Sequence, residues 1–105
     1  MGKKCLSVPA DLMARIYALC EGEDDLIAIM ATVSAELFQA VEGFDWVGFY
    51  RVVAPNLLKI GPYQGGHGCL VIPFDQGVCG AAARYKTIQL VDDVDGFEGH
   101  IACSS

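Results

Sequence analysis

The sequence predicts an α+β domain in which an antiparallel sheet is flanked by helices. The first half of the chain repeats apolar residues at helical spacing, whereas the part from Phe44 onward is rich in aromatic and β-branched residues in short runs. This order of elements is typical of an α+β fold. With 105 residues, 53% of them hydrophobic, the chain is long enough for one core, so a single domain over residues 1–105 is expected.

Two helices are expected in the first half. Ser7 is a candidate cap for the first helix, Pro9 falls in its first turn and Gly22 ends it. The second helix follows the acidic run 23–25, which suits the positive end of a helix dipole, and stops at Gly43. Both contain apolar stripes: Leu12, Ile16 and Leu19 in the first, and Leu26, Met30, Val33, Leu37 and Val41 in the second. These stripes predict helices that pack on a sheet.

The second half predicts strands and one short helix. Their expected order is a strand over 46–53, a turn at 54–56, a strand over 57–63, a glycine-rich loop over 64–68, a strand over 69–74, a helix-prone run over 77–85 and a strand over 87–91. Trp46, Gly48 and Tyr50 share one face of the first strand because side chains alternate. The glycine leaves a recess between two aromatic rings, suited to a small apolar ligand group. The alternative is that both rings are core aromatics.

Charge and hydropathy exclude two classes of partner. The net charge of −6 and the pI near 4.6 argue against nucleic acid, which is held mainly by clustered Lys and Arg. The apolar runs are far shorter than the roughly 18 residues that span a bilayer. The first ten residues lack the apolar centre of a signal peptide. We therefore expect a soluble, cytoplasmic protein that binds neither nucleic acid nor a membrane.

Three of the five cysteines lie in the glycine-rich second half: Cys69, Cys79 and Cys103. An odd number of cysteines favours reduced thiols, catalysis or metal binding over a static disulfide framework. A nucleophilic cysteine must be accessible and have a lowered pKa, and His100 lies three residues before Cys103. Because Cys69 and Cys103 both border loops, their Cα atoms can approach within the roughly 7 Å that a disulfide needs.

Other interpretations of these residues remain open at this point. All the cysteines could be small buried hydrophobes. A metal site could be drawn from His67, Cys69, Cys79, His100 and Cys103. No C-x-x-C pair is present, so we expect no metal. The acidic residues 92, 93 and 95 lack the rest of a calcium-loop pattern and are explained by a solvated loop.

Five motifs in order carry a resemblance to a known family: WVGFY at 46–50, GPYQG at 61–65, Cys69 with IP at 72–73, GVCG at 77–80 and GHIAC at 99–103. Together, over about residues 24–105, they resemble the free methionine-(R)-sulfoxide reductases, which are catalytic members of the GAF-domain superfamily. The resemblance implies a GAF-like antiparallel sheet flanked by helices. It also favours a chemical role for the cysteines over a packing role.

The resemblance further implies a mechanism without a cofactor. The cysteine that matches Cys103 attacks the sulfur of free methionine-(R)-sulfoxide, methionine leaves, and a sulfenic acid remains. The cysteine that matches Cys69 condenses with it to a disulfide, which thioredoxin or another dithiol reduces. Cys79 matches a third family cysteine with an auxiliary role. The methyl-binding recess carries over to Trp46 and Tyr50, and a contact on the oxygen or backbone side carries over to Ile101.

The chain also departs from the family pattern. Family members usually have Arg, Pro and Asp at the positions of Gln76, Glu98 and Ser104. They also continue into strands whose carboxylates receive the substrate's ammonium group and polarise its oxygen. We therefore expect a chain truncated at its C-terminal end, without the last strands and the C-terminal helix. The alternative function is a catalytically incompetent GAF-type module that binds a ligand or a protein, with a homodimer or a partner chain completing the sheet.

Overall fold

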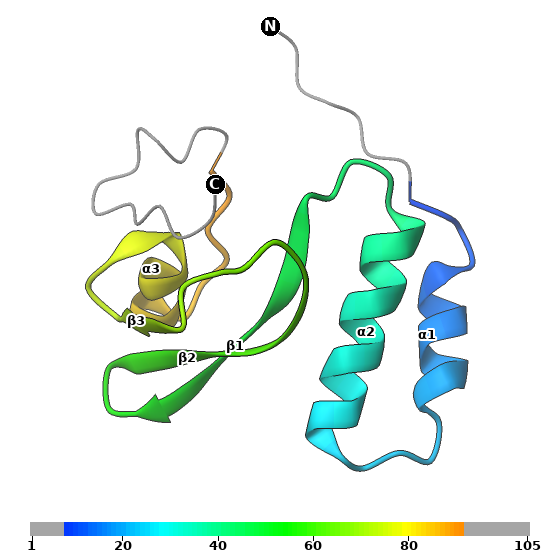
Figure 1. The fold of residues 1–105 in the computed structure, drawn as a ribbon, viewed down its shortest axis with the longest axis horizontal. Coiled ribbons are helices and arrows are strands. Elements are labelled where there is room, and N and C mark those ends of the chain that lie inside the picture. The colour runs from blue at the N-terminus through cyan, green and yellow to red at the C-terminus, as the bar shows by residue number, and fades with distance from the viewer. Residues whose placement is uncertain (1–7, 92–105) are drawn as a thin grey trace, which may run out of the picture. The chain divides into compact units, whose positions relative to one another are not determined.

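The computed structural model describes residues 8–91, shown in colour in Figure 1. The elements in chain order are α1 (Leu12–Cys20), α2 (Leu26–Ala40), β1 (Trp46–Ala54), β2 (Leu57–Gly65), β3 (Val71–Pro73) and α3 (Gly77–Tyr85). The described residues group into two compact units. One comprises residues 8–49 and 61–66, and the other comprises residues 50–60 and 67–91.

In the first unit, α1 and α2 lie side by side (Figure 1). Leu12, Ile16 and Val41 are buried between them and form a hydrophobic cluster. The predicted stripes are confirmed at these positions: helical spacing places Leu12 and Ile16 on one side of α1, and Val41 directly follows the last residue of α2. The prediction of a buried stripe is wrong for Leu19, near the end of α1, and for Leu26, at the start of α2, whose side chains are 55% and 63% exposed.

The helix boundaries follow local chemistry. The carboxylate of Asp25 caps α2 by accepting the Ile27 backbone N–H at 3.0 Å, which confirms the acidic N-terminus expected there. α1 begins at Leu12, later than expected from Pro9, and Ser7 lies outside the described residues. Gly43 follows α2 with a φ of 104°, a left-handed conformation that glycine adopts without strain.

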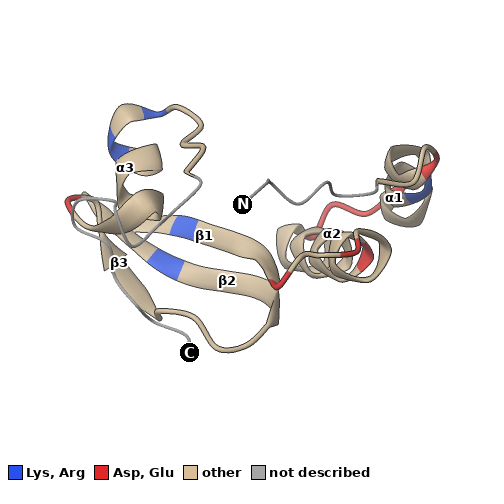
Figure 2. Ribbon diagram, turned by 90° about the horizontal axis from the view of Figure 1, so that it is seen from above, with Lys and Arg blue, Asp and Glu red and all other residues tan. Residues whose placement is uncertain are grey.

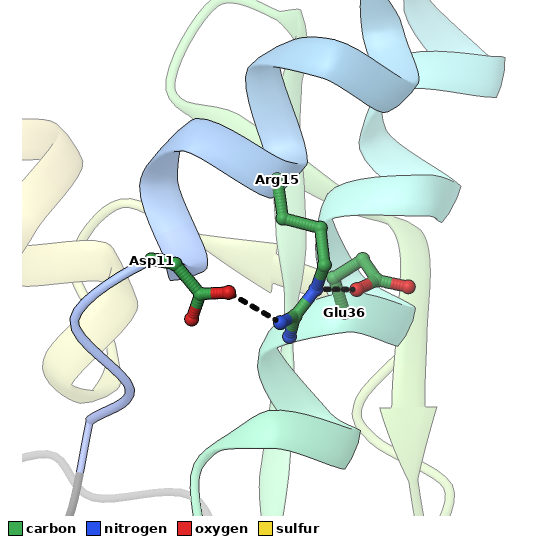
Figure 3. Close-up of polar contacts among 3 residues, drawn as sticks. All are labelled: Asp11, Arg15 and Glu36. Carbon is green, nitrogen blue, oxygen red and sulfur yellow. Dashed lines mark hydrogen bonds and ion pairs between the residues drawn. The ribbon is translucent and has the colours of Figure 1, made fainter.

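An arginine links the two helices (Figure 3). The Arg15 Nε donates to Glu36 Oε1 at 3.1 Å, and its Nη1 lies 3.5 Å from Asp11 Oδ2. The Glu36 side chain is 24% exposed, whereas that of Asp11 is 74% exposed. Since solvent screens the second pair more strongly, the contact with Glu36 is expected to contribute more.

A Glu36→Gln variant is expected to lower the free energy of unfolding by about 0.5 kcal/mol, within the range of partly exposed ion pairs. Urea denaturation at low salt measures the loss, and about 1 M NaCl should remove most of it through screening. Asp11→Asn is the matched control and should cost less. An equal loss for both variants, or a loss unaffected by salt, would contradict this ranking.

The sheet has the strand order β1-β2-β3. β1 and β2 form the predicted hairpin, with its turn at Pro55 and Asn56, and Asn56 has the φ of 59° that such a tight turn requires. β3 pairs antiparallel with β2, with Leu58 opposite Ile72. The strand boundaries differ from the prediction: β1 ends at residue 54 and not 53, β2 extends to residue 65 and not 63, and β3 is shorter than the range 69–74.

In the first unit, α2 also contacts the end of β2. Ser34 is completely buried, and its hydroxyl donates to the backbone carbonyl of Pro62 at 3.4 Å. The serine takes a position inside the apolar face of α2, which is acceptable because its one polar group has a partner. The contact fixes the backbone next to Tyr63.

In the second unit, α3 packs closely on β3. A Cβ added at Gly80 would lie 2.8 Å from the Pro73 carbonyl oxygen and 2.9 Å from that of Phe74. Arg84, in the last turn of the helix, donates a hydrogen bond to the Phe74 carbonyl. The predicted helix over 77–85 is confirmed, and glycine is required at residue 80 for the close approach to the strand.

The predicted strand over 87–91 is wrong. Residues 88–91 have no regular secondary structure, and the side chains of Ile88 and Leu90 are 94% and 87% exposed. The alternation of apolar residues gives a tendency towards a strand, but a strand forms only when backbone groups pair with a neighbour. Within residues 8–91, no strand pairs with this segment.

Charge is distributed unequally between the units (Figure 2). The described part of the first unit has eight acidic residues and one basic residue, Arg15. The described part of the second has one acidic residue, Asp75, and four basic ones: Arg51, Lys59, Arg84 and Lys86. Both arginines of the second unit bind backbone carbonyls, so half of its cations have structural contacts. Over the described residues, no helix has the length and apolarity needed to cross a membrane.

Candidate active site

Four of the six predicted site residues lie in the described part of the chain. Trp46 belongs to the first unit, and Tyr50, Cys69 and Cys79 belong to the second. Ile101 and Cys103, together with His100, lie outside the described residues.

In the first unit, Trp46 is held in a defined position. Its indole ring stacks on Tyr63, with the ring centroids 5.2 Å apart and the planes inclined at 20°. Its Nε1–H donates to the Gly66 carbonyl at 2.8 Å. Stacking and a directed hydrogen bond together fix both the plane and the rotation of the ring.

The predicted recess at Gly48 is occupied by the protein itself. A Cβ at this position would lie 2.3 Å from the Cβ of Tyr63 and 2.7 Å from Trp46 Cη2. The glycine therefore allows the Trp46 ring to lie across β1 and against Tyr63. It does not leave an empty space for a ligand group at that point.

Tyr63 is the residue of this group that sequence reasoning missed. Counting equal steps away from the Pro55–Asn56 turn places Gly48 opposite Tyr63, in agreement with the short approach of their Cβ positions. Large aromatic residues often cover a glycine on the neighbouring strand. The hairpin register was therefore the signal that could have identified the Trp46–Tyr63 pair.

In the second unit, Tyr50 contacts the segment that contains Cys69. The Tyr50 hydroxyl donates to the backbone carbonyl of Cys69 at 2.8 Å. One residue further on, the Leu70 carbonyl accepts the Ile60 N–H at 3.0 Å and continues the pairing of β2 with β3. The backbone of Cys69 is thus held next to the end of the sheet by a tyrosine side chain.

The described cysteines differ in chemical state. Cys69 is half-buried and disulfide-bonded, whereas Cys20 and Cys79 have free thiols. The partner of Cys69 is therefore neither of the other described cysteines. In residues 8–91, no group of three or more His, Cys, Asp and Glu side chains is arranged to hold a metal ion.

Cys79 is the third residue of α3, and it is exposed. Although the residue as a whole reaches solvent, the protein around the thiol disfavours the thiolate, and this desolvation raises the pKa of Cys79 above its ordinary value of 9.0. At neutral pH the thiol is therefore protonated and a poor nucleophile.

We expect Cys79 to react more slowly with iodoacetamide in the folded chain than in the same chain unfolded in urea, measured at pH 7.5 by peptide mass spectrometry. Because the pKa of Cys79 is raised in the folded chain, less of the thiol is ionised there than in the unfolded chain at pH values below that pKa. The thiolate fraction of the folded chain increases as the pH rises through its pKa. The difference between folded and unfolded chain should therefore narrow at alkaline pH. Faster alkylation in the folded chain at pH 7.5 would contradict the proposed burial effect.

Comparisons with known proteins give a consistent result. No protein-family model matches the chain. The free methionine-R-sulfoxide reductase of Escherichia coli is 40% identical over 96 residues, which are 91% of this chain and 58% of that protein. The reduced form of fRMsr from Staphylococcus aureus is 38% identical with a TM-score of 0.85, over 97% of this chain and 67% of that one. A putative GAF sensor protein from Burkholderia vietnamiensis is 41% identical with a TM-score of 0.83, over 90% of this chain and 59% of that one.

The chain thus spans a little under three fifths of the E. coli relative's length. The match extends over about nine tenths of this chain. The α+β architecture of the described residues agrees with the structural similarity to the GAF sensor protein. On this sequence identity and structural similarity, the chain belongs to the free methionine-(R)-sulfoxide reductase family of GAF-fold proteins.

Proposed function

We propose that this chain supplies the thiol chemistry of a free methionine-(R)-sulfoxide reductase. The observation that carries the proposal is the state of the described cysteines: Cys69 forms a disulfide, whereas Cys20 and Cys79 do not. Of the three described cysteines, only Cys69 is disulfide-bonded, which fits a redox role for this residue. Membership of the reductase family supports the choice of substrate.

In the proposed reaction, the Cys103 thiolate attacks the sulfur of methionine sulfoxide. The oxygen is transferred from the substrate sulfur to the cysteine sulfur: the substrate S–O bond breaks, one proton is taken up, a sulfenic acid forms on Cys103, and methionine leaves as the thioether. The Cys69 thiol then attacks the sulfenic sulfur, which forms the disulfide and releases water. Thioredoxin or another dithiol reduces the disulfide by thiol exchange, and no cofactor takes part. Each turnover thus transfers two electrons from the dithiol to the sulfoxide.

We assign the substrate methyl group to the rings of Trp46 and Tyr50, with Ile101 as a further contact, as membership of the family implies. Support comes from the fixed orientation of Trp46, which stacks on Tyr63 and donates to Gly66. A preordered side chain such as that of Trp46 loses little conformational entropy when a small ligand binds. Cys79 has an auxiliary role in this scheme, in keeping with its raised pKa.

Stereospecific methionine formation tests the proposed function. The full chain is incubated with dithiothreitol and either free methionine-(R)-sulfoxide, the free (S) form or the (R) form within a peptide, and methionine is quantified by chromatography. Methionine is expected only from the free (R) form. Methionine at the level of dithiothreitol alone with all three substrates would contradict the proposal.

The second candidate function is a non-catalytic interaction module. The nearly full exposure of Ile88 and Leu90 favours it, because alternating apolar residues at the end of the described chain suit pairing with another strand. The partner would be a second copy of the chain or another protein. Light scattering after size exclusion distinguishes these cases. A dimer without reductase activity would favour the module, and an active monomer would exclude it.

A further inference from the structure

The segment around Cys69 has an anchor at each end. Tyr50 donates to the carbonyl of Cys69 in the second unit, and Trp46 donates to the carbonyl of Gly66 in the first, both at 2.8 Å. The residues between these anchors are His67 and Gly68, in a stretch with no regular secondary structure. Both anchors are side chains that the proposed mechanism otherwise uses only for their apolar rings.

The regular sheet does not supply this positioning. β3 begins at Val71, and the bond between the Ile60 N–H and the Leu70 carbonyl extends the pairing by one residue. Cys69 lies just beyond that pairing, in a segment rich in glycine, which has many accessible backbone conformations. A hydrogen bond to its own carbonyl removes much of that freedom at the residue that carries the sulfur.

We infer that Tyr50 and Trp46 are positioning residues for disulfide formation at Cys69, acting through the phenol hydroxyl and the indole N–H. For the reductase, this rests on the proposed role of Cys69 as the resolving thiol. By removing backbone freedom at Cys69 and at Gly66, three residues before it, the two hydrogen bonds reduce the conformational entropy that is lost when the Cys69 thiol forms its disulfide. They thereby favour capture of the sulfenic acid, with loss of water, over its further oxidation.

The ring and the hydroxyl of Tyr50 can be tested separately. If Tyr50 acts only through its apolar ring, Tyr50→Phe leaves the stability of the Cys69 disulfide unchanged, because phenylalanine has a similar ring. If Tyr50 also positions Cys69, removing the oxygen weakens the disulfide. The equilibrium between the reduced chain with glutathione disulfide and the oxidised chain with two glutathiones measures this directly. It needs no substrate, so its result is independent of whether the chain reduces methionine sulfoxide.

Tyr50→Phe is expected to lower the equilibrium constant for the Cys69 disulfide by about threefold to tenfold, the factor that the net contribution of one hydrogen bond supports. The full chain is equilibrated in glutathione buffers, quenched with acid, alkylated and analysed by peptide mass spectrometry. Tyr17→Phe is the matched control, because Tyr17 is 71% exposed on α1, and it should leave the constant unchanged. Trp46→Phe should lower the constant as well.

An unchanged constant in both Tyr50→Phe and Trp46→Phe would overturn the inference, as would an equal decrease in Tyr17→Phe. Circular dichroism of the reduced variants checks folding. If the reduced Tyr50→Phe variant is unfolded, the equilibrium constant of Trp46→Phe provides the test. A decrease in its constant then supports the inference, and an unchanged constant overturns it.

Discussion

A Cys103→Ser variant is expected to form methionine from free methionine-(R)-sulfoxide only at the rate of dithiothreitol alone. A serine hydroxyl is not ionised at neutral pH and cannot replace the thiolate that attacks sulfur. The expected loss is at least about a thousandfold, the scale on which removal of a catalytic nucleophile acts. Chromatographic quantification of methionine measures it.

Cys69→Ser has a different expected phenotype, which separates the two thiols. The variant keeps the nucleophile, so without reductant it should release one methionine per chain and retain a sulfenic acid that dimedone traps. Cys20→Ser is the matched control, because this half-buried thiol on α1 has no part in the mechanism. Loss of the first methionine in Cys69→Ser, or continued turnover in Cys103→Ser, would contradict the assignment of roles.

A Gly48→Ala variant is expected to destabilise the folded chain by about 1–3 kcal/mol, the usual cost of overpacking. The new methyl group would lie 2.3 Å from the Tyr63 Cβ, which belongs to a strand and moves only with its backbone. The Trp46–Tyr63 stack must therefore open. Urea denaturation measures the loss of stability, and the fluorescence of Trp46, the only tryptophan of the chain, reports on the stack.

Gly66→Ala is the control for this prediction. A Cβ at Gly66 meets no atom within 4 Å, so the same chemical change should cost much less there. A Gly48→Ala chain with unchanged stability and unchanged Trp46 emission would show that the close packing over Gly48 is not required. Reduced stability of equal size in both variants would point to a general effect of replacing glycine in the hairpin.

Much of the described fold could be predicted because its signals are local. Asp25 caps α2 through a backbone group two residues away, and Pro55 with Asn56 sets the hairpin turn. Local signals were not sufficient for the strand expected over 87–91, because alternating apolar residues do not indicate whether a neighbouring strand is present to pair with them. The stripe of α2 likewise did not show that buried Ser34 completes it, since its partner Pro62 is 28 residues away.

The candidate site was less predictable than the fold. The period of two placed Trp46 and Tyr50 on one face of β1, but their hydrogen-bond partners come from beyond the hairpin turn. Tyr63 was missed for the same reason, because stacking depends on register between strands. The roles of Cys69, Cys79 and Cys103 came from the order of motifs, since spacing alone left packing and chemistry equally open.

A single turnover without reductant tests the proposed thiol chemistry most directly. The fully reduced chain is mixed with one equivalent of free methionine-(R)-sulfoxide, quenched, and divided between methionine quantification and peptide mapping of disulfides. We expect one methionine to be released for each disulfide formed, with the disulfide joining Cys69 to Cys103. Methionine release without that disulfide, or no methionine at all, would contradict this chemistry.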